Sequence, residues 1–370
     1  MTNKQHIKVI IAGGGTGGHV FPAIAIAQAL KRADANTDIL FVGALGKIEM
    51  QKVPSYGFEI VGLNIAGFDR KSLLKNVTLP WKLIKSLWQC RGLLSSFKPD
   101  IVVGVGGYAS FPMLYIAQLF GIKTLIQEQN SFAGKSNKIL AKKADAICVA
   151  YQNMERFFPK EKIVLTGNPI RSIVRNVNNI TREQACIHFR LEVSKKIILI
   201  IGGSLGAKSI NDTLQKQYRD LTDSNLQLIW QTGSISYESV KSVIANHPNI
   251  YLSEFISEMD MAFAAADIIV SRSGASSISE LTLVAKPVIF VPYPYASEDH
   301  QTSNALALKE KKAALIVKNS ETDGKLINTI LNLVNDEATC NTMSSQLSLL
   351  NVGHADEKIA DIILKITSHS

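Results

Sequence analysis

Two glycine-rich segments carry residues whose types and spacing suit phosphate binding. The first reads GGGTGGH from Gly13 to His19, and the second reads GGSLGA from Gly202 to Ala207. Each follows a short apolar run and precedes a helical pattern, which predicts a turn from a strand into a helix. Glycines in such a turn let backbone N–H groups and the helix N-terminus approach a phosphate closely. The sequence therefore predicts two phosphate-binding turns, one in each half of the chain.

Two common phosphate sites do not fit the first turn. A P-loop has a lysine directly after its last glycine, whereas here His19 and Val20 follow. A dinucleotide-binding turn is accompanied by an acidic residue that ends the second strand, about 20 residues further on, and binds the ribose. The second predicted strand ends FVGA at residues 41–44, without a carboxylate. The sequence therefore argues against both a P-loop and NAD binding.

The second turn also matches the GxSxG pattern of serine hydrolases, with Ser204 as the nucleophile. Histidines follow it at His247, His300 and His354, so the order of a catalytic triad does not exclude this alternative. Those hydrolases have a single sheet, which is a poor match to a chain that repeats the strand–glycine–helix pattern. A serine in this turn would also donate its hydroxyl to a phosphate, and we favour that role.

A polar segment in the C-terminal half could recognise a nucleoside. It reads SRSGASSISE from Ser271 to Glu280. Its small residues permit close approach of a ligand, and Glu280, one turn into the predicted helix, could accept hydrogen bonds from two ribose hydroxyls. The alternative is an ordinary helix whose acidic first turn is stabilised by the helix dipole. The next segment, EDHQTSNA at residues 298–305, is by itself a polar loop that caps a helix.

Alternating strands and helices must position these motifs. Short β-branched runs alternate with helical patterns through most of the chain, which is typical of parallel sheets buried on both faces. The series is interrupted by TGNP at residues 166–169, the best candidate for a hinge. The sequence predicts strands at Lys8–Ala12, Asp38–Val42, Asp100–Val103, Lys123–Ile126, Ala146–Val149 and Lys162–Leu165, and then at Lys196–Ile201, Leu226–Trp230, Ile250–Leu252, Ile268–Val270 and Pro287–Val291.

This pattern predicts an α/β protein of two Rossmann-like domains whose parallel sheets face across a cleft. A length of 370 residues suits two domains. We expect an N-terminal domain over residues 1–167 and a C-terminal domain over residues 168–351. Helices are expected at Pro22–Leu30 and at Asp356–Ile366, and residues 352–370 are expected to pack back on the N-terminal domain.

Composition and charge limit the partners. No apolar run approaches the roughly 20 residues that span a bilayer, and the N-terminus has no signal-peptide core. A net charge of +9 suits an acidic partner, but no nucleic-acid-binding module is present, which leaves anionic lipid and phosphate-bearing substrates. The four cysteines are scattered and lack metal-type spacing, so we expect buried, reduced thiols in a cytosolic protein.

Residues 70–91 are basic, contain no acidic side chain and predict contact with a membrane surface. A helix that begins near Pro80 carries one apolar stripe, Leu83 to Leu94, which is sufficient for core packing. A second stripe consists of Trp81, Ile84 and Trp88, and the remaining side carries Lys82 and Lys85. Tryptophans beside lysines suit an interfacial anchor to anionic lipid. An unusually wide core face is the alternative.

Seven motifs, in their order along the chain, resemble the MurG family of bacterial glycosyltransferases. They are GGGTGGH (13–19), GVGGY (104–108), QEQN (127–130), TGNPIR (166–171), GGSLGA (202–207), SRSGASSISE (271–280) and EDHQTSNA (298–305). The resemblance implies a GT-B fold and an inverting transfer of N-acetylglucosamine from UDP-N-acetylglucosamine to the muramoyl 4-hydroxyl of undecaprenyl-diphospho-muramoylpentapeptide (lipid I), giving lipid II for peptidoglycan synthesis. It also implies that no metal or other cofactor is needed, and the chain has no DxD pair to hold one.

The resemblance implies roles for individual residues from their places in the motifs. Ser204 and the helix N-terminus after it would hold the donor diphosphate, with Arg171 reaching it from the hinge. Glu280 would bind the ribose, and the backbone of Ile256 would meet the uracil. Further substrate contacts would come from Thr16, Gly17 and Gly18 towards the acceptor diphosphate and the transferred sugar, from Ala275, Ser276, Ser277, Ile278 and Ser279 along the nucleotide, and from Asn130 and Gln301 on the sugar. Some members have two consecutive glutamines where Thr302 follows Gln301 here, a departure that bears on sugar selectivity.

A base must accept the proton of the attacking hydroxyl, and His19 is our preferred candidate. Free imidazole titrates near pH 6.5, about right for this work, and His19 directly follows the predicted acceptor turn. Glu128 or another carboxylate is the alternative. The lipid-linked acceptor implies a peripheral enzyme on the inner face of the bacterial plasma membrane. Alternatives for the whole chain are another membrane-surface GT-B enzyme, such as a diacylglycerol glycosyltransferase, the Ser204 hydrolase, and a nucleotide-binding module without activity.

Overall fold

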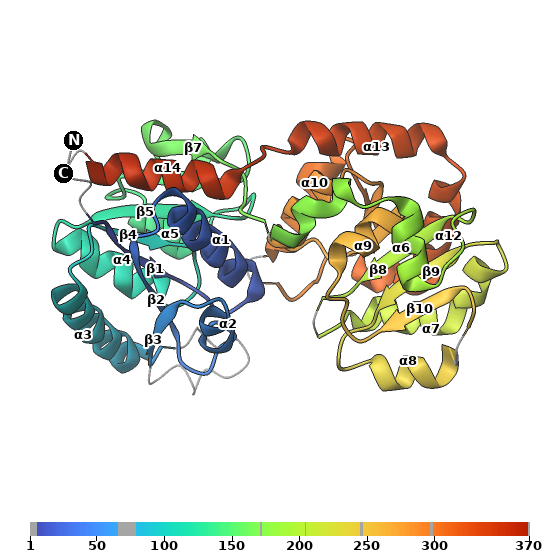
Figure 1. The fold of residues 1–370 in the computed structure, drawn as a ribbon, viewed down its shortest axis with the longest axis horizontal. Helices are drawn as coiled ribbons and strands as arrows, with labels where there is room; N and C mark the ends of the chain where they lie inside the picture. The colour runs from blue at the N-terminus through green and yellow to red at the C-terminus, as the bar shows by residue number, and fades with distance from the viewer. Residues whose placement is uncertain are drawn as a thin grey trace. The chain divides into compact units, whose positions relative to one another are not determined.

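The computed structural model describes residues 6–65, 79–170, 172–203, 205–244, 247–296 and 299–368. The chain divides into two compact units (Figure 1). Unit 1 comprises Met1–Ile170 together with Val352–Ser370, and unit 2 comprises Arg171–Asn351. Each unit has its own sheet and its own hydrophobic core. The chain therefore runs from unit 1 into unit 2 and returns to unit 1 for its last helix.

Unit 1 is built on a seven-stranded parallel sheet with the order β3-β2-β1-β4-β5-β6-β7. Its central strands are apolar throughout because both faces of the sheet are covered, and Val9, Ile10 and Ile11 of β1 are fully buried. The strands span Lys8–Ala12 (β1), Asp38–Ala44 (β2), Glu59–Leu63 (β3), Ile101–Gly104 (β4), Lys123–Glu128 (β5), Ala146–Val149 (β6) and Ile163–Leu165 (β7).

Helices cover both faces of this sheet, and the alternation of side chains along β1 separates two cores. Val9 and Ile11 belong to the core under α1 and α14, whereas Ile10 belongs to the core under α3, α4 and α5. The last helix lies beside α1, where Arg32 pairs with the buried Asp356 at 2.8 Å (Figure 1). These helices are α1 (Gly17–Ala33), α2 (Glu49–Ser55), α3 (Leu79–Phe97), α4 (Ser110–Leu119), α5 (Lys135–Leu140) and α14 (Ala355–Ser368), with 3-10 turns at Met154–Arg156 and Lys160–Lys162.

Unit 2 repeats the plan with a six-stranded parallel sheet in the order β10-β9-β8-β11-β12-β13. Its strands are β8 (Ile197–Ile201), β9 (Gln227–Gln231), β10 (Ile250–Ser253), β11 (Ile268–Ser271), β12 (Val288–Phe290) and β13 (Leu315–Ile316). Its helices are α6 (Arg182–Phe189), α7 (Lys208–Thr222), α8 (Tyr237–Ile244), α9 (Met259–Ala265), α10 (Ala275–Val284), α11 (His300–Lys309), α12 (Thr322–Val334) and α13 (Glu337–Leu350), with 3-10 segments at Ser172–Asn179 and Asn319–Glu321. Trp230 of β9 is the largest fully buried side chain, in the core shared with α7 and α12.

The predicted α/β class with one parallel sheet in each of two units is confirmed, and every strand expected from the sequence is present with its ends moved by at most two residues. Two strands were not expected, for identifiable reasons. β3 begins with the exposed Glu59 and contains a glycine, and β13 has only two residues. The first helix begins at Gly17 rather than at Pro22, so Pro22 lies inside it. The four cysteines are free, three of them buried and Cys340 partly buried.

Strand order identifies a special place in each sheet. In unit 1 the chain leaves β1 towards β2 on one side, whereas β4 lies on the other side of β1. In unit 2, β8 lies between β9 and β11 in the same way. Loops that leave such a point diverge and open a crevice at the carboxyl ends of the strands, where open α/β sheets bind their ligands. Both glycine-rich turns follow these central strands, β1 and β8.

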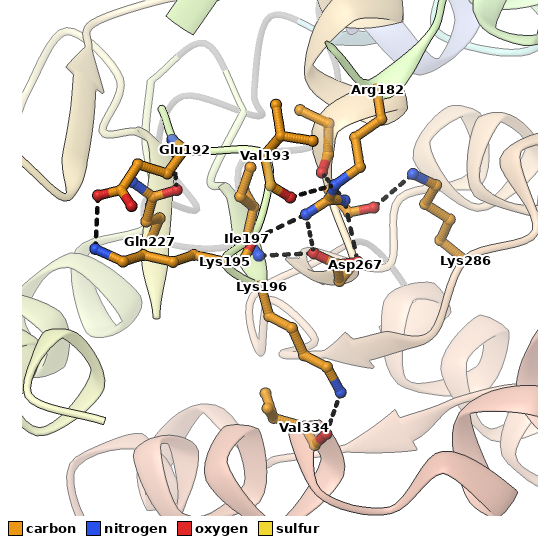
Figure 2. Close-up of polar contacts among 12 residues, drawn as sticks. Arg182, Glu192, Val193, Lys195, Lys196, Ile197, Gln227, Asp267, Lys286 and Val334 are labelled. Atoms are coloured by element: carbon orange, nitrogen blue, oxygen red, sulfur yellow. Dashed lines mark hydrogen bonds and ion pairs between the residues drawn. The ribbon is translucent and has the colours of Figure 1, made fainter. Parts of the chain in front are cut away.

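A polar network lies at the other end of the second sheet, at the amino ends of β8 and β11 (Figure 2). Arg182 of α6 forms two hydrogen bonds with Asp267, at 3.1 and 2.9 Å. The same guanidinium donates to the carbonyl oxygens of Ala265 and Lys195, both at 2.8 Å. Asp267 also accepts the backbone N–H of Ile197 at 2.7 Å. The network therefore joins α6, the end of α9 and two strands, far along the strands from the glycine turns.

We expect Asp267→Ala to lower the free energy of unfolding of unit 2 by about 2–3 kcal/mol, because it leaves a half-buried guanidinium without its carboxylate and removes the partner of the Ile197 N–H. Urea unfolding followed by tryptophan fluorescence reports on this unit, because Trp230 is fully buried in it whereas Trp81 and Trp88 of unit 1 are already exposed. Asp212→Ala is the matched control, because its pair with Lys208 lies on the surface and its loss should cost less than about 0.5 kcal/mol. Equal losses in the two variants would contradict the structural role of the network.

Candidate active site

The first glycine turn of unit 1 is interlocked with the loop that follows β4. The Gly13 N–H donates to the Val42 carbonyl at 3.0 Å, and the Gly14 N–H donates to the Gly106 carbonyl at 3.1 Å. A Cβ atom added at Gly107 would lie 2.1 Å from the Gly14 carbonyl oxygen, so only glycine fits there. Gly107 also has a φ of +84°, in the left-handed region that favours glycine. The GGGTGGH and GVGGY motifs, distant in the sequence, thus form one structure.

The residues expected to form an acceptor loop are in fact the start of a helix. Thr16 is the N-cap residue of α1, with an extended backbone (φ −144°), and Gly17 and Gly18 form the first turn. The backbone N–H groups of a first helical turn have no partners within the helix and attract anions. The Thr16 side chain makes no capping hydrogen bond to this turn. This end of α1 therefore has the chemistry of an anion site.

His19 lies in the same turn and is held from two sides. Its Nδ1 atom is 3.1 Å from the Thr16 hydroxyl, which can donate or accept according to the tautomer of the ring. The other edge of the ring faces Gly106, where an added Cβ would lie 2.8 Å from Cδ2 and 2.9 Å from Nε2 of the imidazole. The ring is partly exposed. A glycine on one side and a hydroxyl on the other thus set the direction of the imidazole.

Glu128, the alternative base, is enclosed at the end of β5. Its side chain is 2% exposed, and burial raises the pKa of its carboxyl although hydrogen bonds from Asn137, Gly134 and Asn130 lower it. The carboxylate accepts the Asn137 amide at 2.8 Å, the Gly134 N–H at 3.1 Å, and both the backbone and side-chain nitrogens of Asn130, at 3.1 and 3.3 Å. Each oxygen of the carboxylate thus accepts two hydrogen bonds from the protein. Glu128 therefore orients Asn130 and has no free oxygen to accept a proton from an external hydroxyl.

Buried amides connect this strand end to the segment at residues 166–169. The Gln129 side chain donates to the Val105 carbonyl at 2.7 Å and to the Gln127 side chain. Gln127 donates to the Asn168 side chain at 2.8 Å, and Asn168 donates back to the Gln129 carbonyl at 3.0 Å. All three side chains are at most 8% exposed. The segment at residues 166–169 is therefore connected to the end of β5 and to the loop after β4. A buried polar network whose hydrogen bonds are satisfied is rigid.

The second glycine turn, in unit 2, is packed as tightly as the first. A Cβ atom at Gly206 would lie 2.1 Å from the Thr232 carbonyl oxygen, and one at Gly233 would lie 2.0 Å from the Gly206 nitrogen. Asn211 of α7 locks this contact, because it donates to the Thr232 carbonyl at 2.8 Å and accepts the Trp230 indole N–H at 2.9 Å. The turn leads into α7, which begins at Lys208. Ser204, together with Arg171, lies outside the described residues.

Helix α10 carries the residues expected along the nucleotide. Glu280 lies in its second turn and is 6% exposed, and the first turn contains no acidic residue, so a helix dipole does not explain this carboxylate. Ala275 and Ile278 are buried on the core side. Among the residues with described positions, the Ser276 hydroxyl is buried without a hydrogen-bond partner, whereas the Ser279 hydroxyl donates to the Ala275 carbonyl at 2.8 Å. Ser277 is partly exposed beside Gly274.

Arg272 joins the loops that surround α10. Its guanidinium donates to the carbonyl of Val291 and to the side chain of Asn319, both at 2.8 Å, and burial lowers its pKa to about 10. Gln301 accepts the Tyr293 N–H through its side-chain oxygen at 3.0 Å. The loops after β11 and β12 and the start of α11 therefore form one connected rim at the carboxyl ends of these strands.

Ile256 follows β10 and is 2% exposed. Its backbone N–H donates to the side-chain oxygen of Gln231 at 3.0 Å. Gln231 is itself buried at the end of β9. The backbone of Ile256 is therefore held in place by its neighbour strand.

Two residues of these sites were not selected from the sequence. Arg272 lies within the SRSGASSISE motif. An arginine among small residues is a signal for a side chain that binds an anion or joins loops by hydrogen bonds. Glu49 is buried under the first glycine turn and is the one acidic residue between Asp38 and Glu59. The carboxylate of a dinucleotide site would end the second strand, whereas this one lies at the start of the helix after it. Its isolation in an otherwise apolar and basic stretch was the available signal.

The chain matches known proteins along almost its whole length. Residues 9–149 match the glycosyltransferase family 28 N-terminal domain, and residues 197–363 match the glycosyltransferase family 28 C-terminal domain. Relatives from Flavobacterium psychrophilum and Bacteroides thetaiotaomicron are each 48% identical, with 98% of both chains covered, and each is named UDP-N-acetylglucosamine--N-acetylmuramyl-(pentapeptide) pyrophosphoryl-undecaprenol N-acetylglucosamine transferase. The crystal structure of Acinetobacter baumannii MurG aligns with a TM-score of 0.77 at 28% identity, covering 97% of this chain and 99% of that one. The chain therefore belongs to glycosyltransferase family 28 and, within it, to the MurG family of N-acetylglucosaminyltransferases.

Proposed function

We propose that this enzyme transfers N-acetylglucosamine from UDP-N-acetylglucosamine to the muramoyl 4-hydroxyl of undecaprenyl-diphospho-muramoylpentapeptide, with inversion at the anomeric carbon. The product is lipid II, a precursor of peptidoglycan. The full-length identity of 48% to transferases named for this donor and this acceptor carries the proposal. Both substrates contain a diphosphate, and each unit presents a glycine turn at the point where its strand order reverses.

Unit 2 would bind the donor. Glu280 would accept hydrogen bonds from the ribose hydroxyls, and the unpartnered hydroxyl of Ser276 is available to the nucleotide. Since the Ile256 N–H is already bonded to Gln231, its carbonyl is the group that we assign to the uracil N3–H. Gln301 would reach the sugar through its side-chain nitrogen, because its oxygen is bonded to Tyr293. The remaining donor contacts would come from Ala275, Ser277, Ile278 and Ser279 along α10, and from Ser204 and Arg171 on the diphosphate.

Unit 1 would bind the acceptor and remove its proton. The first turn of α1, with Thr16, Gly17 and Gly18, would face the acceptor diphosphate and the transferred sugar, and Asn130 would contact that sugar. His19 would accept the proton of the attacking hydroxyl while the bond from the anomeric carbon to the UDP oxygen breaks on the opposite face. Oriented N–H groups at the leaving diphosphate would stabilise the charge that develops there.

An exposed apolar surface on unit 1 suits a lipid-linked acceptor. Trp81 is 77% exposed, Ile84 48% and Trp88 66%, which supports an interfacial stripe over the alternative of a wide core face. The neighbouring helix α4 ends at Leu119, and this residue and the following C-cap residue, Phe120, are each 55% exposed. The Arg91 guanidinium lies over the rings of both Trp88 and Phe120, at 5.8 and 5.6 Å, which joins the two helices into one surface. Lys85 on α3 is exposed and Lys82 partly exposed.

This surface would hold the enzyme at the inner face of the bacterial plasma membrane. None of the helices with described positions is long and apolar enough to cross a bilayer. Aromatic rings with adjacent lysines bind at the headgroup level of anionic membranes. Residues 70–78, which carry three of the six basic side chains of the predicted segment, lie outside the described part of the chain.

We expect the double variant Trp81→Ser and Trp88→Ser to bind phosphatidylglycerol vesicles at least about tenfold more weakly, since two large apolar side chains are withdrawn from the interface. Vesicle sedimentation measures the binding. Tyr295→Ser, which changes an 83% exposed aromatic residue in unit 2, is the control and should leave vesicle binding unchanged. Unchanged binding by the double variant would favour a different membrane contact.

The function is tested by turnover of UDP-N-acetylglucosamine with a lipid I analogue. We expect one UDP released for each disaccharide formed, and a β-linked product. Diacylglycerol is the competing acceptor, and turnover with it alone would favour the other membrane-surface glycosyltransferase. UDP-glucose and UDP-N-acetylgalactosamine, offered in parallel, test whether Gln301 followed by Thr302 still selects the sugar. Absence of turnover with every acceptor would overturn the proposal.

A further inference from the structure

A buried carboxylate lies directly beneath the first glycine turn. Glu49 is the first residue of α2, and its side chain is 1% exposed. No cationic side chain of the described residues lies within ion-pair distance of it. A carboxylate in this position is costly to bury unless its oxygens are hydrogen-bonded. Its partners therefore explain why it is there.

Both partners are backbone N–H groups of loops at the carboxyl edge of the sheet. One oxygen, Oε1, accepts the Ala44 N–H at 2.9 Å, where β2 ends. The other, Oε2, accepts the Gly15 N–H at 2.8 Å, in the turn before α1. The carboxylate thus bridges the turn that follows β1 and the last residue of β2.

Glycines on either side make room for this bridge. A Cβ atom at Gly14 would lie 2.3 Å from the carboxyl carbon of Glu49, and one at Gly43 would lie 2.5 Å from its Cγ atom. The peptide between Gly14 and Gly15 is held from the other side as well, because the Gly14 carbonyl oxygen lies against the Cα of Gly107. Since the C=O and N–H of a trans peptide point in opposite directions, these two contacts define the orientation of the whole peptide plane.

The orientation of this peptide decides how the chain enters α1. Thr16 is the N-cap and follows Gly15 directly. Its hydroxyl is hydrogen-bonded to Nδ1 of the His19 ring. We propose that Glu49 is a positioning residue for the acceptor side of the reaction, which acts through the Gly15 peptide to direct the N-terminus of α1 and the His19 imidazole. This inference rests on the proposed function of those groups. Because Glu49 lies in unit 1 and the nucleotide residues lie in unit 2, the effect should leave binding of the nucleotide unchanged.

Glu49→Gln tests the bridge with minimal change of shape. A carboxamide has one oxygen, so its NH₂ group must face either the Gly15 N–H or the Ala44 N–H as donor against donor. We expect kcat/KM for the lipid I analogue to fall about 10- to 30-fold, with the dissociation constant of UDP unchanged within twofold. Hydrogen exchange at the Gly15 amide should become at least about tenfold faster. Glu59→Gln, an exposed glutamate in the same unit, controls for loss of charge.

Gly43→Ala supplies a second variant in case Glu49→Gln does not fold. The new methyl group meets the Glu49 side chain, and the backbone at Gly43 is not in the left-handed region, so the substitution displaces the carboxylate while keeping its charge. It should produce the same loss of kcat/KM. Normal acceptor kinetics in whichever variant folds, or an equally large loss of affinity for UDP, would overturn the positioning role. If the wild-type enzyme fails to use lipid I, the proposed function fails, whereas faster exchange at Gly15 in the variants would still support the bridge.

Discussion

Replacing His19 with alanine should lower kcat for transfer to a lipid I analogue by about 10²- to 10⁴-fold, the range that a general base contributes. The imidazole lies in the first turn of α1, oriented by the Thr16 hydroxyl and by the space above Gly106. Removing it leaves the attacking hydroxyl without a proton acceptor, whereas the donor residues in unit 2 are untouched. Steady-state kinetics gives kcat, and titration calorimetry gives the affinity for UDP, which should change less than twofold.

A second variant separates the ring from its support. Thr16→Val removes the hydroxyl beside Nδ1 but keeps the imidazole, and we expect a loss of only about three- to tenfold, the value of one neutral hydrogen bond. The rate of the wild-type enzyme should also decrease at acidic pH, where a protonated imidazole cannot accept a proton, and this decrease should be absent in the alanine variant. Near-normal turnover of His19→Ala would exclude it as the base. The enclosed Glu128 would not then be the obvious replacement, because its oxygens are already occupied.

Replacing Glu280 with alanine should weaken binding of UDP-N-acetylglucosamine about 30- to 100-fold, or roughly 2–3 kcal/mol. This buried carboxylate in the second turn of α10 is assigned to the ribose hydroxyls, and hydrogen bonds to an ionised group are about twice as strong as neutral ones. Calorimetric titration with the donor measures the loss directly. Glu238→Ala is the matched control, since it removes an exposed carboxylate from α8 of the same unit.

A modified donor shows whether the loss comes from the ribose. The wild-type enzyme should bind a donor with 2′-deoxyribose about tenfold more weakly than the natural donor, whereas Glu280→Ala should bind both with similar affinity. Such coupling between a side chain and a ligand group isolates their direct interaction. If the variant discriminates between the two donors as strongly as the wild-type enzyme does, Glu280 acts on the fold of α10 rather than on the ribose.

Local patterns predicted the elements well because they depend on neighbours in the sequence. The apolar runs at Lys8–Ala12 and Ala146–Val149 became strands with those ends. The spacing of Trp81, Ile84 and Trp88 identified a stripe that a helix would turn away from its core, and the exposure of these side chains agrees. Where a segment lacked the pattern, as in β3 with its glycine and its exposed first residue, the prediction failed. The residues of β3 do not by themselves indicate a strand, and the segment is a strand because it pairs with β2.

Contacts between loops were beyond the reach of such patterns. The sequence places 84 residues, 20–103, between the GGGTGGH and GVGGY motifs, and nothing in either predicts that a Cβ at Gly107 would meet Gly14. The contact arises because β4 pairs with β1, which brings the two following loops together at one edge of the sheet. Glu128, an open candidate for the base from its motif, is enclosed because the segment after β5 folds back and brings Gly134 and Asn137 to its carboxylate.

By itself, the sequence determined the chemistry of the two glycine turns, the alternation of strands and helices, and the family to which the chain belongs. These follow from residue types and short spacings, which need no knowledge of strand order. The tertiary structure alone decided that GGH is the first turn of a helix, that Gly106 frames the His19 ring, and that Glu49 supports the turn from below. Each of these depends on distant segments that meet where strand order reverses, and burial there decides which polar groups are occupied and which remain for a substrate.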